Sequence, residues 1–488
     1  MAFPLVLAAV AGCVTVGAFA PFGLFPVAFL GLAVLFRLLA DARGAAGGFA
    51  IGLAWGLGHF LGGVSWLFVA LNRYGGMPAP VAAVAILLFC AYLALFPALV
   101  GALWVRLRRR VGWQDVLLGG ALWTAFELAR GWLLTGFPWL SIGYSQVPPS
   151  PLAGYAPLAG VFGVGFLVAL CAAALALAPW RRASPAAAIG LVVAVMAGGI
   201  ALRDEAWTQP SGEPLTVSLI QTDIEQSLKW RADLQRQWLQ VNLDLVREHP
   251  ARLVVLPETA IPMLAEQLPR DYLAVLGDAV AGLGGDLVFG IFVREPDGAI
   301  HNAAVSIGAG PVQRYAKQHL VPFGEYSPPM FGWFYDWASI PMSDQTPGAV
   351  DQGALRFDDQ QVAVNICYED VFGGEIARAA RSATILLNLS NLAWYGDSLA
   401  QPQHLQIARM RALETGRPML RSTNTGMTAV VLPDGRVGAQ LPAFERGAIR
   451  AEVQGYSGET PYMRWGDRPA GFAVLVAGLL ALIRWRRA

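Results

Sequence analysis

Residues 362–370 read VAVNICYED, an apolar run that stops at a lone cysteine and two carboxylates. A short apolar run bounded by polar residues is typical of a strand buried inside a sheet. Six further runs of this kind lie at residues 216–221, 253–256, 287–293, 303–307, 384–389 and 428–432. We therefore predict a multi-stranded sheet structure in which Cys367 lies at the end of a strand.

Helical patterns lie between these predicted strands. Four apolar residues at a spacing of four, three and four define one face of a first helix: Leu234, Trp238, Val241 and Leu245. A second helix is predicted at about 402–415, ended by Gly416. Strands that alternate with helices indicate a layered α/β domain, with its core at about residues 214–455.

The composition divides the chain into two parts. Hydrophobic residues make up 55% and charged residues 14%, whereas soluble proteins carry about 25% charged residues. Residues 1–200 hold ten Arg, no Lys and three acidic residues, so most charges lie in the later part. These numbers exclude an ordinary soluble protein, a disordered chain and a disulfide-rich secreted scaffold. The net charge of +1 gives no support for nucleic-acid binding.

Eight stretches are apolar enough to predict transmembrane helices, which need about 20 mostly apolar residues. They lie at about 4–20, 24–40, 49–71, 79–103, 116–135, 157–178, 186–202 and 469–484. We interpret the chain as a seven-helix membrane domain, a soluble domain and a C-terminal transmembrane helix. These parts are predicted at residues 1–202, 203–468 and 469–488.

Arginines gather at alternate ends of the predicted membrane helices. The arginine-bearing ends lie at residues 37–43, 106–110, 181–182 and 484–487. The other connections, near 21–23, 72–78 and 136–156, carry only Arg73. Because arginine-rich loops stay in the cytoplasm, we expect both termini there and residues 203–468 on the opposite side of the membrane.

Two ionisable residues lie inside the fifth predicted membrane helix. Glu127 and Arg130 are three positions apart and can pair on one helix face. We expect a structural ion pair turned into the helix bundle rather than a catalytic pair. A transporter with an extracytoplasmic binding domain is an alternative for the whole chain. It is disfavoured because the membrane helices carry almost no other ionisable residues, which transporters use.

Three chemically active residues lie where predicted strands end. Glu258 follows the run LVVLP, Lys317 precedes HLVPFGEY, and Cys367 follows VNI. Active sites of α/β folds assemble at strand ends. A thiol is mostly protonated at neutral pH and needs a base to become a nucleophile. Glu258 can accept its proton, and Lys317 can stabilise the thiolate and an oxyanion. These residues indicate covalent catalysis.

The lysine count supports a special role for Lys317. Only two of the 35 basic residues are lysine, Lys229 and Lys317. A compact ammonium and a planar guanidinium are not interchangeable. A lysine in this arginine-rich chain therefore indicates a specific role rather than surface charge. We expect Lys229, by contrast, to lie at a surface turn and to tolerate arginine.

No metal site is predicted. The five histidines show no metal-ligand spacing, and no cluster of Cys and His is typical of zinc. Three cysteines fall in apolar helices, where they behave as small hydrophobes: Cys13, Cys90 and Cys171. Cys367 has no cysteine partner in the predicted soluble domain.

Several motifs of the chain resemble those of a known family. The set Pro257-Glu258, Lys317 and Cys367-Tyr368-Glu369 resembles the Glu-Lys-Cys triad of the nitrilase/amidase superfamily. Seven helices before such a domain and one after it resemble the apolipoprotein N-acyltransferases, which complete lipoprotein maturation in bacteria. The resemblance covers essentially the whole chain and implies an αββα sandwich. One motif departs from the family, since Leu392 stands where an Asp is usual.

The resemblance also implies roles for individual residues. Glu258 would be the general base, Lys317 the electrostatic stabiliser and Cys367 the nucleophile. Supporting roles would fall to Glu325, which assists Lys317, and to Tyr368 and Glu369, which shape the site. Trp230 would contact substrate, although plain packing is the alternative for Trp230 and Tyr368.

The implied reaction takes a fatty acyl chain from a phospholipid such as phosphatidylethanolamine. The chain passes through a thioester on Cys367 to the α-amine of a diacylglyceryl-cysteine on an apolipoprotein. No metal or soluble cofactor is implied, because the donor is itself an activated ester. The implied location is the bacterial inner membrane, with the catalytic domain in the periplasm. A membrane-anchored amidase, in which water takes the acyl group, is the closest alternative.

Aromatic residues at two places are compatible with a lipid substrate. Residues 326–337 read YSPPMFGWFYDW, which suits the membrane interface or a loop packed on the domain. If the segment faces the membrane, we expect a mobile lid. Trp139, Tyr144 and Tyr155, in residues 136–156, are predicted to form a facing aromatic rim.

Overall fold

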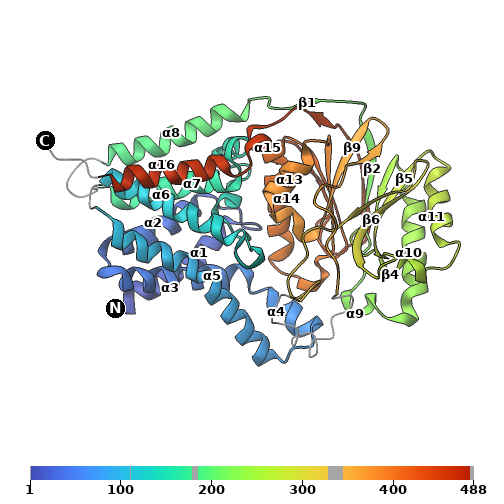
Figure 1. The fold of residues 1–488 in the computed structure, drawn as a ribbon, viewed down its shortest axis with the longest axis horizontal. Helices are drawn as coiled ribbons and strands as arrows, with labels where there is room; N and C mark the ends of the chain where they lie inside the picture. Colours follow the sequence, from blue (N-terminus) through green and yellow to red (C-terminus); the bar gives the residue numbers. More distant parts are fainter. Residues whose placement is uncertain (1, 110–111, 179–184, 328–343, 484–488) are drawn as a thin grey trace. The chain divides into compact units, whose positions relative to one another are not determined.

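The computed structural model describes residues 2–109, 112–178, 185–327 and 344–483. It divides into two compact units (Figure 1). The first consists of Met1–Leu67, Pro80–Ala206 and Arg464–Ala488, and the second of Phe68–Ala79 and Trp207–Met463. The first unit is helical, and the second contains the sheets.

All eight predicted membrane segments are helical. They are α1 (Ala2–Thr15), α2 (Pro26–Asp41), α3 (Gly44–Val64), α5 (Ala79–Leu107), α6 (Gly112–Arg130), α7 (Ala156–Leu177), α8 (Ala186–Arg203) and α16 (Arg468–Leu482). Within the described residues, four helical stretches are long and apolar enough to cross a membrane. These are Gly44–Val64, Ala79–Leu107, Pro151–Leu177 and Ala186–Arg203. Helices α1, α2 and α16 have 14, 16 and 15 residues, fewer than the roughly 17 at the lower end of the range for a transmembrane helix. Helix length by itself therefore supports fewer crossings than the predicted eight.

The predicted pair in α6 is structural. Arg130 lies 3.9 Å from Glu127, and both side chains are buried. Arg130 donates hydrogen bonds to the main-chain oxygens of Phe137 and Trp139. Glu127 accepts one from the backbone N–H of Ile142 at 2.7 Å. The pair therefore holds the segment that follows α6 against that helix.

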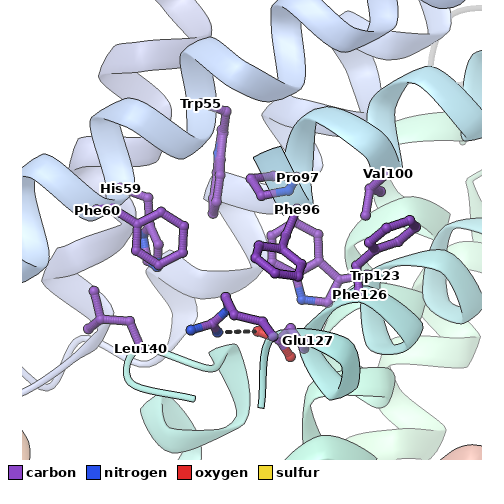
Figure 2. A pocket seen from close by; sticks show the side chains of 11 residues that line it. Trp55, His59, Phe60, Phe96, Pro97, Val100, Trp123, Phe126, Glu127 and Leu140 are labelled. Atoms are coloured by element: carbon purple, nitrogen blue, oxygen red, sulfur yellow. Dashed lines mark ion pairs between the residues drawn. The ribbon is translucent and has the colours of Figure 1, made fainter. Parts of the chain in front are cut away.

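A small cavity borders this ion pair (Figure 2). Glu127 lies at one side of it, and Trp55 and His59 from α3 line another part. The two rings stack with their centroids 4.8 Å apart. The cavity volume of about 20 Å³ has room for one water molecule but not for a lipid. The cavity is thus a feature of helix packing.

The predicted aromatic rim at residues 136–156 is wrong for two of its rings. Trp139 is 3% exposed and Tyr144 is 1% exposed. The ring of Trp139 packs against those of Trp66 and Phe137. Because the segment is pulled back onto the helices, its large rings fill the first unit instead of facing outward.

Two mixed sheets form the centre of the second unit. The first has the order β14-β2-β3-β5-β6-β7, with β4 beside β5, and the second has the order β13-β12-β11-β10-β9-β8. The first comprises β2 (Leu215–Gln221), β3 (Leu253–Val255), β4 (Ile261–Leu264), β5 (Asp286–Arg294), β6 (Ile300–Gly308), β7 (Gln313–Ala316) and β14 (Gly447–Val453). The second comprises β8 (Leu355–Phe357), β9 (Gln360–Ile366), β10 (Ile385–Ser390), β11 (Met419–Thr423), β12 (Ala429–Val431) and β13 (Val437–Gln440).

Helices cover the outer face of each sheet (Figure 1). They are α10 (Gln235–Glu248) and α11 (Tyr272–Ala281) on the first sheet, and α13 (Gly373–Ala380) and α14 (Ala400–Thr415) on the second. A buried apolar cluster joins the inner faces of the two sheets and includes Cys367. The second unit is therefore an αββα sandwich, which confirms the predicted fold of the soluble part.

The predicted strands and the two predicted helices of this unit are all present. The continuous apolar runs are strands because sheet on one side and helix on the other bury both faces. Helices α11 and α13, the seven-residue strand β14 and several shorter strands lie outside the predicted elements. Strand β13 shows why, since its residues alternate between half-buried and exposed positions in an otherwise polar stretch.

A short segment from the N-terminal half also belongs to the second unit. It includes the π-helical turn η2 (Ala70–Tyr74). Arg73 pairs with Glu225 at 3.3 Å, and the ring of Tyr74 meets that of Trp394 edge-on at 5.9 Å. The sequence did not indicate this membership, because the segment lies between two apolar helices.

Candidate active site

The three predicted catalytic residues follow strands of both sheets. Glu258 comes shortly after β3, and Lys317 directly follows β7. Cys367 directly follows β9 in the other sheet. Lys317 Nζ lies 3.4 Å from Glu258 Oε1 and 2.7 Å from Glu325 Oε1. The structure thus brings together the predicted base, the lysine and the supporting carboxylate.

The carboxylate of Glu258 is held at both oxygens. Asn302 Nδ2 donates to Oε1 at 2.9 Å, and the backbone N–H of Asn391 donates to Oε2 at 2.8 Å. Asn302 also reaches Glu325 Oε1 at 3.4 Å. The sequence analysis did not single out Asn302. The only signal that could have found it is that it is a polar residue within the mostly apolar strand β6.

Lys317 is a buried cation between two carboxylates, with its side chain 0% exposed. Burial by itself would lower the pKa of its ammonium, but Glu325 and Glu258 together raise that pKa well above the ordinary value. The second oxygen of Glu325 accepts from the backbone N–H of Val321 at 2.8 Å. Lys317 is therefore charged and fixed in place at neutral pH.

Cys367 has an unusual backbone conformation for its residue type. Its φ of +55° lies in the left-handed region, which costs a non-glycine residue on the order of 1–3 kcal/mol. Burial raises the pKa of its thiol well above the ordinary value, and the carboxylate of Glu258 raises it further. The Asn391 N–H that donates to Glu258 also acts on this thiol and lowers its pKa. The resting thiol is thus protonated.

Glu369 connects the cysteine turn to the lysine segment. One oxygen accepts from the backbone N–H of Ile366 at 2.5 Å. The other accepts from the N–H groups of Gln318 and His319, which directly follow Lys317. Burial raises the pKa of Glu369 to about 7. This predicted supporting residue therefore fixes the position of Cys367 relative to Lys317.

The two predicted aromatic contacts lie in different surroundings. Tyr368 is buried, and its ring meets Phe372 edge-on at 5.2 Å. Trp230 is half-buried and packs against Phe292, with ring centroids 5.9 Å apart. Leu392, at the position that departs from the family motif, is buried in the same apolar cluster as Cys367. Most of the aromatic segment 326–337 lies outside the described residues.

The prediction that Lys229 lies at a surface turn is wrong. Lys229 ends the short helix α9 (Gln226–Lys229) and is only 1% exposed. Its Nζ lies 3.4 Å from the main-chain oxygen of Glu258. The local sequence resembles a polar turn, but packing against the segment that carries Glu258 buries the side chain.

A buried polar network lies behind the cysteine turn. Asp370 pairs with His404 at 2.6 Å and with Arg421 at 3.3 Å. Arg421 also donates to Asn388 Oδ1, and Asn388 Nδ2 donates to the main-chain oxygen of Cys367 at 3.2 Å. Burial lowers the pKa of His404. The network holds the carbonyl of the nucleophile and was not predicted.

Comparisons with known proteins show which family the chain belongs to. Residues 216–462 match the carbon-nitrogen hydrolase family, and residues 11–174 match the apolipoprotein N-acyltransferase N-terminal domain. The chain is 46% identical over 494 residues to the apolipoprotein N-acyltransferase of Nitrosomonas europaea, with 99% of each chain covered. The chain belongs to the apolipoprotein N-acyltransferase family.

Further similarities extend the comparison. The apolipoprotein N-acyltransferase of Ralstonia nicotianae is 46% identical over 500 residues, covering 100% of this chain and 94% of that protein. A carbon-nitrogen hydrolase structure from Helicobacter pylori G27 is 17% identical, with a TM-score of 0.38, and covers 56% of this chain and 96% of that one.

Membership of the apolipoprotein N-acyltransferase family makes this chain a membrane acyltransferase with a hydrolase-type catalytic domain. The part of the chain that the structure describes contains no group of three or more His, Cys, Asp or Glu able to hold a metal. The site residues contribute a thiol from Cys367, carboxylates from Glu258 and Glu325, and the buried ammonium of Lys317.

Proposed function

We propose that this chain transfers a fatty acyl group from a phospholipid to the α-amine of an N-terminal diacylglyceryl-cysteine on apolipoproteins. The observation that carries the proposal is the buried Lys317 ammonium between Glu258 and Glu325, with the buried Cys367 thiol near enough for Glu258 and Lys317 to shift its pKa. This arrangement suits acyl transfer through a thioester.

In the first half-reaction, Glu258 takes the proton of the Cys367 thiol as sulfur attacks the ester carbonyl carbon. The resting thiol needs this base because its pKa is raised. The Lys317 ammonium stabilises the oxyanion that forms. The intermediate collapses by breaking the ester C–O bond, and the leaving alkoxide receives the proton from Glu258. A thioester and a lysophospholipid result.

In the second half-reaction, the neutral amine of the apolipoprotein attacks the thioester carbon. Glu258 takes a proton from the attacking nitrogen, and Lys317 again stabilises the oxyanion. The C–S bond breaks, and Glu258 returns the proton to the thiolate. An amide and the free thiol result. This sequence needs no metal or cofactor, because the phospholipid ester is already activated.

The remaining site residues have supporting roles in this proposal. Glu325 keeps Lys317 charged and positioned, and Glu369 aligns the cysteine turn with the lysine segment. Trp230 contacts substrate, and Tyr368 shapes the site beside the Cys367 thiol. The donor is a phospholipid such as phosphatidylethanolamine.

The proposed setting is the bacterial inner membrane, with the catalytic domain facing the periplasm. Support comes from eight apolar helical segments and from the arginines at alternate helix ends. The proposed boundaries are a membrane domain at 1–202, a catalytic domain at 203–468 and a final transmembrane helix at 469–488. The topology can be tested by fusing, near residue 300, a reporter that works only in the cytoplasm. Activity of that fusion would contradict this topology.

An assay of product separates acyl transfer from hydrolysis. The purified full-length protein is incubated with phospholipid and a peptide that begins with diacylglyceryl-cysteine. We expect the N-acyl peptide from the wild type and from the control Cys13→Ala, but not from Cys367→Ala. Free fatty acid as the main product would identify an amidase-like hydrolase instead.

A further inference from the structure

Both lysines of the chain lie against the same residue. Lys317 Nζ is 3.4 Å from the carboxylate of Glu258, and Lys229 Nζ is 3.4 Å from its main-chain oxygen. Each lysine is only 1% exposed. The chain uses arginine at its other basic positions, so its two lysines coincide with the two buried cations that contact Glu258.

Helix α9 supports Glu258 from two directions. Lys229, at the end of α9, donates to the main-chain oxygen of Glu258. Gln226, at its beginning, accepts a hydrogen bond from Asn391 Nδ2 at 3.0 Å. The backbone N–H of that same Asn391 donates to Glu258 Oε2. A displacement of α9 would therefore move both the backbone and the carboxylate contacts of Glu258.

Burying the ammonium of Lys229 costs free energy. A buried ammonium needs compensating partners, and its one described hydrogen bond is the contact to Glu258. Burial lowers the pKa of Lys229 from 10.5 to about 7, although the charge of Glu258 opposes the shift. An apolar side chain of similar length would avoid this cost, so packing alone does not explain a lysine here.

We propose that Lys229 is a positioning residue for Glu258. Its ammonium fixes the main-chain oxygen of Glu258 and thereby aims the carboxylate at the Cys367 thiol. A point charge with rotatable donors fits this contact, whereas the guanidinium fork is wider. This inference rests on the proposed function, because the role of Glu258 as the base belongs to that function.

The test compares full-length variants Lys229→Met and Lys229→Arg with the wild type in phospholipid nanodiscs. The rate of the first lysophospholipid burst is measured together with the thermal unfolding midpoint. For both variants we expect the burst rate to fall by about a hundredfold, the loss typical of a misplaced catalytic group. We expect the KM for phospholipid to stay within twofold of wild type, because Lys229 does not contact the lipid.

The unfolding midpoint distinguishes positioning from a structural role. Lys229→Met should unfold at the wild-type temperature or higher, since it removes a buried charge. The matched control Arg236→Met, at an exposed position in the adjacent α10, should leave the burst unchanged.

Two results would overturn the inference. One is a burst rate within twofold of wild type in Lys229→Met. The other is a lower midpoint in Lys229→Met together with an unchanged burst rate in its folded fraction. If the wild type itself gives no burst, the proposed function fails first, and the two failures are therefore distinguishable.

Discussion

Replacing Lys317 with arginine keeps the charge and changes only the shape of the cation. The Lys317 side chain is fully buried, with its nitrogen 2.7 Å from one carboxylate and 3.4 Å from another. In both Glu258 and Glu325, Oε1 faces the lysine, and Oε2 accepts a hydrogen bond from a backbone N–H with an N–O distance of 2.8 Å. The surroundings therefore have little freedom to accommodate a wider guanidinium.

We expect Lys317→Arg to slow acylation of Cys367 about a hundredfold. A catalytic donor displaced by about 1 Å costs on the order of a hundredfold in rate, or about 2.7 kcal/mol of transition-state stabilisation. Overpacking a filled site also costs about 1–3 kcal/mol of folding stability. Lys317→Arg should thus be nearly as slow as Lys317→Ala and should unfold at a lower temperature.

The assay is the rate of the lysophospholipid burst in a single turnover, measured on the folded fraction of each variant. Arg236→Lys, at an exposed position, serves as the control for exchanging the two basic residues. A burst rate in Lys317→Arg above one third of the wild-type rate would refute the reasoning. It would show that charge matters at this position and the shape of the cation does not.

Four further changes test other parts of the site. Glu369→Gln places an amide donor against backbone N–H groups, so we expect a loss of about 2 kcal/mol in chemical denaturation and slower acylation. Asp370→Asn leaves the buried guanidinium of Arg421 without its counter-charge, which should cost about 3 kcal/mol by the same measurement. Asn302→Asp adds a third carboxylate beside the lysine and should abolish the burst. Because the pKa of Lys229 is lowered from 10.5 to about 7, the unfolded chain binds more protons between those pH values. Stability should rise with pH across that window in the wild type, and Lys229→Met should flatten the rise.

The strands of the second unit and the three candidate catalytic residues could be predicted from the sequence, because they depend on apolar runs and on the residues that follow them. The run before Cys367 is a central strand because both of its faces are buried, so its pattern is continuous and easy to read. Glu258, Lys317 and Cys367 follow strands, and their residue types alone indicate covalent chemistry. These predictions depend on local sequence.

The features that were missed depend on contacts between distant parts of the chain. Lys229 looks like a turn residue, and its burial arises from the main-chain oxygen of Glu258 29 positions later. In the sequence, Asn302 is only a polar residue in a mostly apolar strand. Its role becomes visible in the fold, which places two carboxylates beside it. The segment Phe68–Ala79 lies between apolar helices, and only tertiary contacts place it with the sheets. Local patterns do not contain such information.

In the proposed reaction, Cys367 carries the acyl chain between donor and acceptor. Intact-protein mass spectrometry after exposure to phospholipid alone tests it most directly. We expect a mass gain of one acyl chain, located on Cys367, together with about one equivalent of lysophospholipid per enzyme. A diacylglyceryl-cysteine peptide should remove that mass as an amide, and Cys367→Ala should show no gain. Continuous release of free fatty acid without any amine, or an acyl chain on Cys367→Ala, would contradict the account.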